Sequence, residues 1–269
     1  MEKSQATEVV RVRGVEAVAA RDWLAVERPL EIRARTDGAV RVVSTTMRTP
    51  GEDLALVAGF LFAEGVVKQA SDLRALESVD EDTVLVELGS EADAALNATK
   101  RSFVTSGACG VCGRASLDGL MSAAAPATRG ETRRIPATVI HALPAALRQA
   151  QTTFAQTGGL HAAGLFTTDG GCLAVHEDVG RHNAVDKLVG TLLLAGQLPA
   201  HDRILVVSGR SSFELVQKAI AAGVPLMVAV GAPSSLAVEM ARTAGMTLLG
   251  FVRDGGFNVY AGAERLNGI

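Results

Sequence analysis

The stretch RILVVSGRSSFELVQKAIAAGVPLMVAV, residues 203–230, decides the fold. Residues 203–208 and 225–230 are short and almost continuously apolar, which is typical of strands buried on both faces. The residues between them have apolar side chains at helical spacing, and Gly223 is a helix stop. A buried strand, a helix and a second buried strand are characteristic of a sheet covered by helices. We therefore predict an α/β fold.

The same alternation continues on both sides of this stretch. We predict strands at 160–166, 172–176 and 246–251 and helices at 183–196 and 234–245. The pattern predicts a largely parallel sheet with helices on both faces. Ligands of such sheets bind beyond the carboxyl ends of the strands, so we expect a site at that edge.

The first hundred residues have a different pattern. Residues 31–36 and 39–44 alternate apolar and polar side chains around a turn, a helix is expected between Pro50 and Gly65, and residues 82–88 form another strand. We therefore predict two domains, a small N-terminal α+β domain at 1–105 and a larger α/β domain at 106–269. Between the glycine-rich start of the larger domain and its sheet, residues 123–144 should contain a connector and the start of a helix.

Composition narrows the class of protein. The chain has 269 residues, 48% of them hydrophobic, with 26 basic and 29 acidic side chains. A nearly balanced charge gives no reason to expect a nucleic-acid partner. The first residues lack the apolar core of a signal peptide, and no apolar run approaches the ~18 residues of a membrane span. We expect a cytoplasmic protein without a membrane partner.

Two of the three cysteines lie in the segment SGACGVCGRAS, residues 106–116. Cys109 and Cys112 could supply half of a zinc site, with Cys172 and His176 as the other half, but strand geometry separates that second pair by about 13 Å. The two thiols could instead form a redox pair, although the surrounding glycines make the segment looser than such a motif needs. A third interpretation is an exposed, reactive thiol, whose thiolate form nearby Lys and Arg side chains would favour.

Polar residues gather where strands are predicted to end. They occur in HEDVGRHNAVDK (176–187), SGRSS (208–212) and GAPSS (231–235). Free amides at helix starts favour phosphate, so we expect a ligand site formed by Arg181, His182, Ser208, Gly209, Arg210 and Ser211. The alternative is structural: Asp178 or Asn183 would cap a helix and Arg181 would pair with Glu177 or Asp178. His161, alone in an apolar strand, is more typical of a hydrogen-bonded core residue.

Four motifs together point to a known family. SGACGVCGRAS, HEDVGRHNAVDK, SGRSSFELVQKA and GAPSSLAVEMA, in this order, closely resemble the FdhD family of formate dehydrogenase accessory sulfurtransferases, from about residue 25 to the end. The resemblance implies that Cys109 takes sulfur as a persulfide from a cysteine desulfurase and passes it to bis-molybdopterin guanine dinucleotide, with Cys112 assisting. It also implies a homodimer, and the catalytic subunit of formate dehydrogenase as a partner. The family's cofactor-binding stretch corresponds to Phe251, Val252, Arg253, Asp254, Gly255 and Gly256, expected at the end of the last strand.

The family is also similar to the cytidine deaminase fold, which implies a three-layer core. In deaminases two helix starts carry the ligands of a zinc ion, including a Pro-Cys-x-x-Cys pair. The corresponding segments here, VGRHNAVDK and SGRSSFELV, lack that cysteine pair. We therefore expect neither a metal nor deamination, and a site suited to nucleotide phosphate remains.

Overall fold

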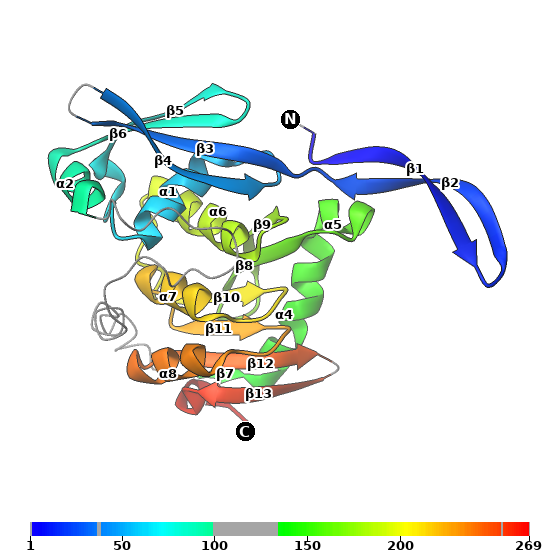
Figure 1. The fold of residues 1–269 in the computed structure, drawn as a ribbon. Helices are drawn as coiled ribbons and strands as arrows, with labels where there is room; N and C mark the ends of the chain where they lie inside the picture. The colour runs from blue at the N-terminus through cyan, green and yellow to red at the C-terminus, as the bar shows by residue number, and fades with distance from the viewer. Residues whose placement is uncertain (1, 37–38, 99–133, 254, 269) are drawn as a thin grey trace.

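The computed structural model describes residues 2–36, 39–98, 134–253 and 255–268. At its centre is a six-stranded sheet with the strand order β13-β12-β11-β10-β8-β9 (Figure 1). Its strands are β8 (His161–Thr167), β9 (Cys172–Asp178), β10 (Arg203–Val207), β11 (Leu226–Ala229), β12 (Thr247–Arg253) and β13 (Gly256–Ala261). The strands predicted from the apolar runs are thus confirmed.

The direction of the strands differs from the prediction. Only β10, β11 and β12 run parallel, whereas β8, β9 and β13 pair antiparallel with their neighbours. The expected largely parallel sheet is therefore wrong. The reason is chain length, because β8 and β9, and also β12 and β13, follow each other too closely for the crossover of about a dozen residues that a parallel pairing needs.

The stretch 251–256 also lies differently from the expectation. It ends β12 and begins β13 instead of closing the last strand, which is the short β14 (Leu266–Asn267) paired with β7 (Ile135–Pro136). The antiparallel β12–β13 hairpin extends this stretch beyond the edge to which β10 and β11 point (Figure 1).

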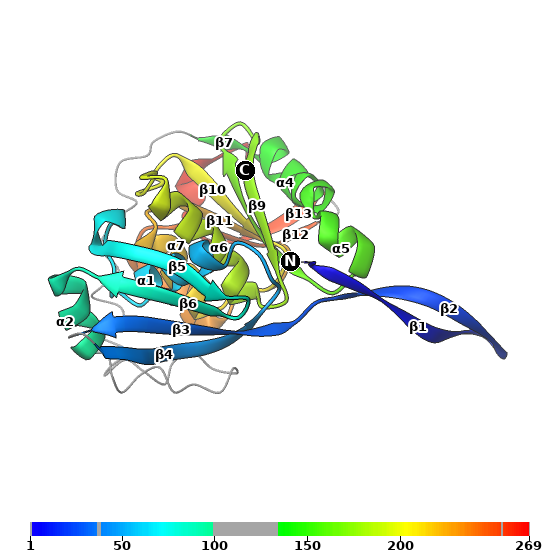
Figure 2. The same ribbon diagram turned by 90° about the horizontal axis from the view of Figure 1, so that it is seen from above.

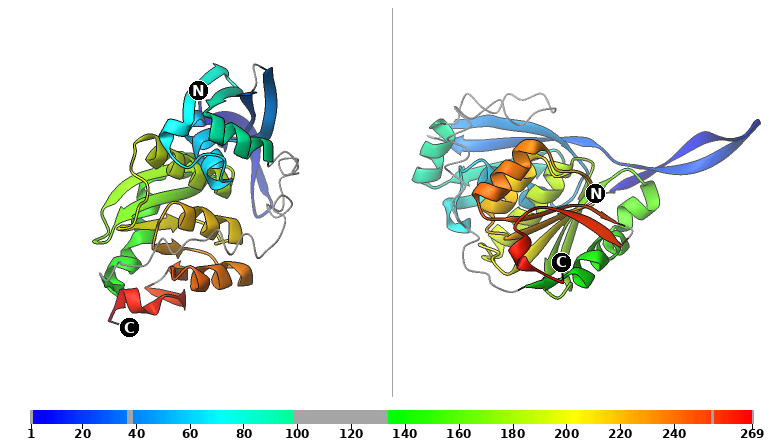
Figure 3. Two further views of the ribbon diagram at one scale, coloured as in Figure 1. Left: turned by 90° about the vertical axis from the view of Figure 1, so that its left-hand side faces the viewer. Right: turned by 90° about the horizontal axis from the view of Figure 1, so that it is seen from below.

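Helices cover both faces of the sheet, as predicted. On one face lie α6 (Arg181–Leu194), α7 (Phe213–Ala221) and α8 (Ser235–Thr243), and on the other lies α4 (Ala137–Ala150), followed by α5 (Thr152–Thr157) (Figure 3). Alternate side chains of β10 enter the two cores: Leu205 and Val207 pack with α6, α7 and α8, while Ile204 and Val206 pack with α4. The result is a cytidine-deaminase-like three-layer core.

A smaller α+β unit precedes this core. Its four-stranded sheet has the order β4-β3-β6-β5 and consists of β3 (Arg28–Thr36), β4 (Ala39–Arg48), β5 (Leu73–Asp80) and β6 (Thr83–Leu88). The helix α1 (Asp53–Ala63) packs against both this sheet and α6, and α2 (Ser90–Ala98) follows β6. The predicted hairpin, helix and strand are confirmed; β5 and α2 were not predicted. The domain boundary at 105/106 lies outside the described residues.

A two-stranded arm projects from the molecule, formed by β1 (Ser4–Arg13) and β2 (Glu16–Ala25) (Figure 2). Its outer part exposes Val10, Val12 and Val18, and its base touches α5, where Ser4 Oγ lies 2.8 Å from Gln156 Oε1. No helix in the described ranges is long and apolar enough to cross a membrane.

Candidate functional site

The loops that follow β10 and β11 are joined at the carboxyl edge of the sheet. The amide of Ser211 donates to the carbonyl of Ala232 at 3.1 Å, and the amide of Ser234 donates to the carbonyl of Ser211 at 3.0 Å. The amide of Gly231 donates to the carbonyl of Gly209. A Cβ atom at Gly231 would lie 3.0 Å from that oxygen, so glycine permits this close approach.

Phe251 connects β12 to the same edge. Its amide donates to the carbonyl of Gly231 at 3.1 Å, and its side chain is 37% exposed. The residue adopts a φ of +54° inside a β-bulge of β12, a conformation that costs free energy for any side chain larger than glycine. The guanidinium of Arg253 lies 5.9 Å from the centre of the Phe251 ring. A strained, exposed aromatic side chain therefore borders the loops.

The start of α6 meets the start of α7 through a hydrogen-bonded cluster. His182 Nε2 lies 3.2 Å from both Ser212 Oγ and Glu214 Oε2, and the Ser212 hydroxyl donates to Glu214 at 2.8 Å. The hydrogen bond with His182 lowers the pKa of Glu214 to about 2 despite partial burial. Ser212 therefore bonds side chains of the site and does not cap α7, whereas Ser234 does cap α8, its Oγ accepting from the amide of Ala237.

His161 and Ser208 close the edge on the side of β8. Ser208 Oγ accepts from the amide of Ala162 at 2.9 Å. Burial lowers the pKa of His161, and the positive charges of Arg181 and His182 lower it further, so its imidazole is neutral at neutral pH. His161 thus lies at the candidate site, and the described residues supply its ring with no hydrogen bond of the kind expected for a core histidine.

The structure brings most of the predicted ligand residues together. Ser208, Gly209, Arg210 and Ser211 form the β10 loop, Phe251 is bonded to the neighbouring loop, and His182 reaches Ser212. Two buried polar atoms in this region have no partner among the described residues, Ser211 Oγ and Arg181 Nε.

Val252 and the glycines of the stretch 251–256 contribute less side-chain surface to this edge than Phe251 does. The side chain of Val252 is fully buried in the core against α4, which leaves only its backbone near the edge. Gly255 and Gly256 are exposed between β12 and β13, and Asp254 lies outside the described residues.

The polar run 176–187 is mainly structural. Glu177 accepts from the amides of Thr153 and Phe154 at the start of α5. Asp178 is fully buried and lies 2.8 Å from Lys187 Nζ, and it also accepts from the amide of Thr49. The run is thus structural, but not through the roles considered above: α6 begins after Gly180 without a side-chain cap, and Arg181 pairs with neither carboxylate within the described ranges.

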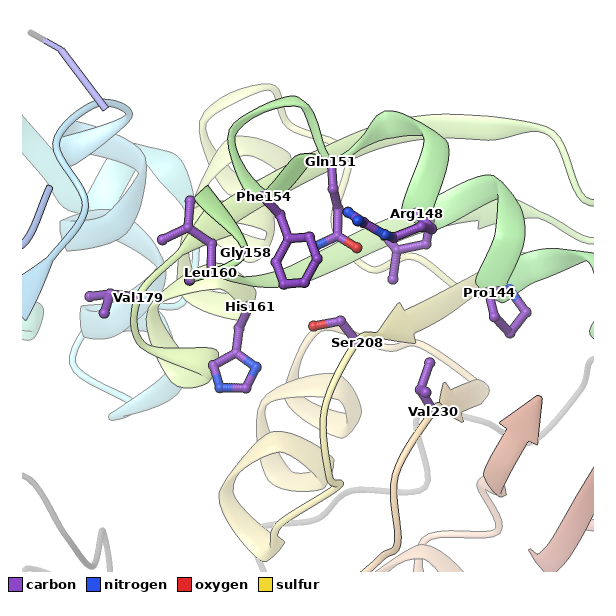
Figure 4. Close-up of a pocket in the computed structure, with 12 residues that line it drawn as sticks. Pro144, Arg148, Gln151, Phe154, Gly158, Leu160, His161, Val179, Ser208 and Val230 are labelled. Carbon is purple, nitrogen blue, oxygen red and sulfur yellow. The ribbon is translucent and has the colours of Figure 1, made fainter. Parts of the chain in front are cut away.

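A pocket of about 500 Å³ opens beside this edge (Figure 4). It lies between α4, α5 and the start of β8, and Ser208 and Val230 join it to the strand-end loops. Its polar lining comes from Arg148, Gln151, His161 and Ser208. Of these, Arg148, Gln151 and the nearby Phe154 were not predicted, because nothing in an ordinary amphipathic helix sequence indicates which side chains face a pocket.

The predicted cysteine site lies mostly outside the described part of the chain. This applies to Cys109 and Cys112. Cys172 is exposed at the far end of β9 from the site, where burial of part of its side chain raises the pKa of its thiol, and His176 Nε2 lies 3.2 Å from Thr191 Oγ1 of α6. The described residues contain no group of three or more His, Cys, Asp or Glu side chains that could hold a metal ion.

The fold and the site together define the class of protein: an α/β protein with a three-layer core, whose loops at the carboxyl edge of the sheet bring together serine hydroxyls, arginines and an exposed aromatic side chain. A solved structure with the same fold covers 99% of this chain and 100% of its own, with a TM-score of 0.77 and 25% identity; it is described as "a putative formate dehydrogenase accessory protein from Desulfotalea psychrophila".

Sequence relatives give the particular family. The model of the FdhD/NarQ family matches residues 25–267. "Sulfur carrier protein FdhD" of Nocardia farcinica is 46% identical over 266 residues, which is 97% of this chain and 94% of that protein. The protein of the same name from Anaeromyxobacter dehalogenans is 47% identical and covers 92% of this chain and 90% of its own. The chain belongs to the FdhD/NarQ family.

Proposed function

We propose that the protein is a sulfur carrier, a sulfurtransferase that takes persulfide sulfur from a cysteine desulfurase and delivers it to bis-molybdopterin guanine dinucleotide for formate dehydrogenase. The observation that carries the proposal is the similarity, over nearly the whole chain, to proteins named sulfur carriers, together with the Cys-Gly-Val-Cys segment at 109–112. A cysteine desulfurase, the catalytic subunit of formate dehydrogenase and a second copy of this chain are its proposed partners, in the cytoplasm.

The loading step needs only a thiolate. Cys109 Sγ attacks the outer sulfur of the desulfurase persulfide, a new S–S bond forms, and the desulfurase thiolate leaves with the electron pair of the broken S–S bond. The oxidation state of the transferred sulfur does not change, so no oxidant is required. Thiolate character at Cys109 sets the rate, and Lys100, Arg101 and Arg114 in the same segment favour it.

The delivery step needs two electrons, because the sulfur leaves as sulfide. The thiol of Cys112 can supply them: its sulfur attacks Cys109 Sγ, the bond to the outer sulfur breaks, and a Cys109–Cys112 disulfide remains. An external thiol can supply the same two electrons. Cys109 is therefore indispensable in this proposal, whereas Cys112 is replaceable.

The loops after β10 and β11, together with the end of β12, would hold the cargo, bis-molybdopterin guanine dinucleotide. Arg210 and Arg253, both exposed, offer charge-assisted hydrogen bonds to a diphosphate. Arg181, His182, Ser208, Gly209, Ser211 and the stretch 251–256 complete the proposed contacts.

Binding of guanosine diphosphate tests the cargo site, since this nucleotide is one end of the cofactor. We expect it to raise the melting temperature by mass action, and Arg253→Ala to reduce that increase while Cys109 is still loaded with sulfur. Arg203→Ala is the matched control, because Arg203 begins β10 at the opposite end of the strand from the loops. No shift at millimolar nucleotide, or an unchanged shift in Arg253→Ala, would show that the cargo binds elsewhere.

A zinc-stabilised binding module and a disulfide oxidoreductase remain the alternatives, with a cofactor chaperone whose cysteines are incidental as a third. Zinc bound in a one-to-one ratio would support the first, and equal loss of activity in Cys109→Ser and Cys112→Ser the second. Full activity without Cys109 would support the third.

A further inference from the structure

The arm formed by β1 and β2 is an amphipathic ribbon. Its cross-strand pairs run from Ser4 opposite Ala25 to Arg13 opposite Glu16. Residues directly opposite each other in an antiparallel pair lie on the same face, and successive residues of a strand alternate between the two faces. Beyond the base of the arm, one face, the apolar face, therefore comprises Ala6, Glu8, Val10, Val12, Ala17, Ala19, Arg21 and Trp23.

The opposite face of the arm, the polar face, has more charges. Its charged side chains are those of Arg11, Arg13, Glu16 and Asp22. The apolar face has a single opposed pair of charges, Glu8 and Arg21. Alternation of this kind is typical of an antiparallel ribbon that packs on one face and meets water on the other. The sequence of the arm therefore provides one face that suits a packing partner.

The apolar face is nevertheless exposed. Val10 is 69% exposed, Val12 63% and Trp23 39%, and Ala17 and Ala19 are exposed as well. Figure 2 shows that the arm extends away from both units beyond α5. A two-stranded ribbon is only marginally stable in water unless one of its faces packs against another element. We therefore expect a second molecule to cover this face in solution.

The base of the arm is fixed to the smaller unit. Lys3 Nζ lies 2.9 Å from Glu52 Oε1 at the start of α1, and the amide of Val26 donates to the carbonyl of Lys3 at 2.9 Å. Only two residues separate β2 from β3. The arm therefore presents its apolar face at a defined position, unlike a flexible tail.

The side chains of the apolar face alternate in size across the two strands. The opposed pairs, each with one large and one small member, are Val10 with Ala19, Val12 with Ala17 and Trp23 with Ala6. When two arms pack face to face about a two-fold axis along their length, β1 of one copy lies over β2 of the other. Each large side chain then meets a small one of the second copy, which is how well-packed layers interdigitate.

The charges of the apolar face fit the same arrangement. Because Glu8 lies opposite Arg21, the two-fold axis brings each of them over its opposite charge in the second copy. A face with a net charge would repel its own copy, whereas the charges of this face cancel. Arg21 is also held at this face, because its guanidinium lies 5.8 Å from the centre of the Trp23 ring.

We propose that the apolar face of the arm is a contact surface for a second copy of this chain, with the two arms packed about a two-fold axis along their length. The inference rests on the proposed function only for the second copy as a partner. In such a dimer the arms form a two-layered contact in which Trp23 of each copy leaves water.

The test measures the association of the full chain by sedimentation equilibrium and by fluorescence, because Trp23 is the only tryptophan of the sequence. We expect a dimer whose formation at rising protein concentration shifts the tryptophan emission to shorter wavelength, since the ring leaves water. Val12→Glu places a charge over Ala17 of the second copy and should weaken the dimer by about tenfold or more. The emission of this variant should stay at the longer wavelength.

A matched control lies on the polar face of the same arm. Val18 is 57% exposed, which is close to the exposure of Val12, but it lies opposite Arg11. Val18→Glu should therefore leave the dimer unchanged. Glu8→Arg should weaken the dimer, and the double change of Glu8→Arg with Arg21→Glu should restore it, because the exchange keeps the charges of the two copies complementary.

The proposal is overturned if the wild type stays monomeric from micromolar to millimolar concentration, if Val12→Glu and Val18→Glu have equal effects, or if the emission of Trp23 does not change as the dimer forms. Emission that shifts only when a cysteine desulfurase is added would likewise reject a second copy as the occupant. Sulfur loading of Cys109, measured by intact mass on the same preparations, tests the proposed function separately. A loaded but monomeric wild type would reject the arm contact and leave the sulfur carrier standing, whereas an unloaded dimer would do the reverse.

Discussion

Gly59 of α1 and Gly190 of α6 lie against each other where the smaller unit meets the three-layer core. A Cβ atom at Gly59 would lie 2.9 Å from the nitrogen of Gly190, and one at Gly190 would lie 2.7 Å from the nitrogen of Gly59. The backbones of the two helices are therefore in direct contact, and α6 carries Arg181 and His182 at its start. The position of one side of the candidate site depends on this contact.

We expect Gly59→Ala and Gly190→Ala each to lower the free energy of unfolding by about 2–3 kcal/mol, because the added methyl group has only backbone to displace. Urea denaturation measures the change. Gly89→Ala is the matched control, since its Cβ would meet no atom closer than 3.6 Å. If Gly59→Ala were as stable as Gly89→Ala, the helices would not be packed as closely as described.

Glu214 predicts a pH dependence of stability. Its pKa falls from 4.5 to about 2 in the folded protein, mainly through the hydrogen bond with His182. A carboxylate with a lowered folded pKa stabilises the protein above the unfolded pKa and loses that contribution as the pH falls toward the folded pKa. The gap in urea midpoint between the wild type and Glu214→Gln should thus be full near pH ~6 and shrink between pH ~4.5 and ~2.

Comparing the wild type with Glu214→Gln at each pH isolates the contribution of Glu214 from that of other acidic side chains. Glu52, Asp72 and Asp80 also have lowered pKa values, but they are present in both proteins and cancel in the difference. A gap that stays constant over this pH range would show that Glu214 is not held by His182 and Ser212.

Replacing Phe251 with glycine should have opposite effects on stability and on nucleotide binding. Its φ of +54° favours glycine, and much of its ring is exposed, so Phe251→Gly should keep or raise the free energy of unfolding, by up to about 1 kcal/mol. The same change should weaken guanosine diphosphate binding, since it removes a side chain from the proposed cargo site. Phe251→Leu, which retains the strain and loses the ring, should be less stable than Phe251→Gly. The reverse order of stability would contradict the strain.

The sequence was most informative where burial is periodic. The runs 203–208, 225–230 and 246–251 became strands because each is apolar on both faces, and the loops after the first two met at one edge as their parallel direction requires. The antiparallel direction of β9 and β13 follows instead from the short β8–β9 and β12–β13 connections, and an apolar pattern does not indicate strand direction. The arm of β1 and β2 was missed because its valines are exposed and so show no buried face.

The candidate site was also predictable only in part, because local sequence does not record which residues meet in the folded protein. Helix starts and loop glycines can be read from local sequence, and these located 208–211 and His182. The polar run 176–187 looked like a site but mostly fixes the fold, because its carboxylates find partners far along the chain, such as the amides of Thr49 and Thr153. The place of Gln151 in the pocket wall is likewise a tertiary property, because it depends on how α4 and α5 pack beside the start of β8.

The most direct test of the central claim is the intact mass of the protein after incubation with a cysteine desulfurase and free cysteine. We predict that the wild type and Cys172→Ser gain the mass of one sulfur atom, that a small thiol removes it, and that Cys109→Ser gains none. Cys112→Ser should still be loaded, because Cys112 acts only at delivery in this account. Failure of the wild type to gain sulfur, or an equal gain in Cys109→Ser, would contradict the assignment of this chain as a carrier that holds its sulfur on Cys109.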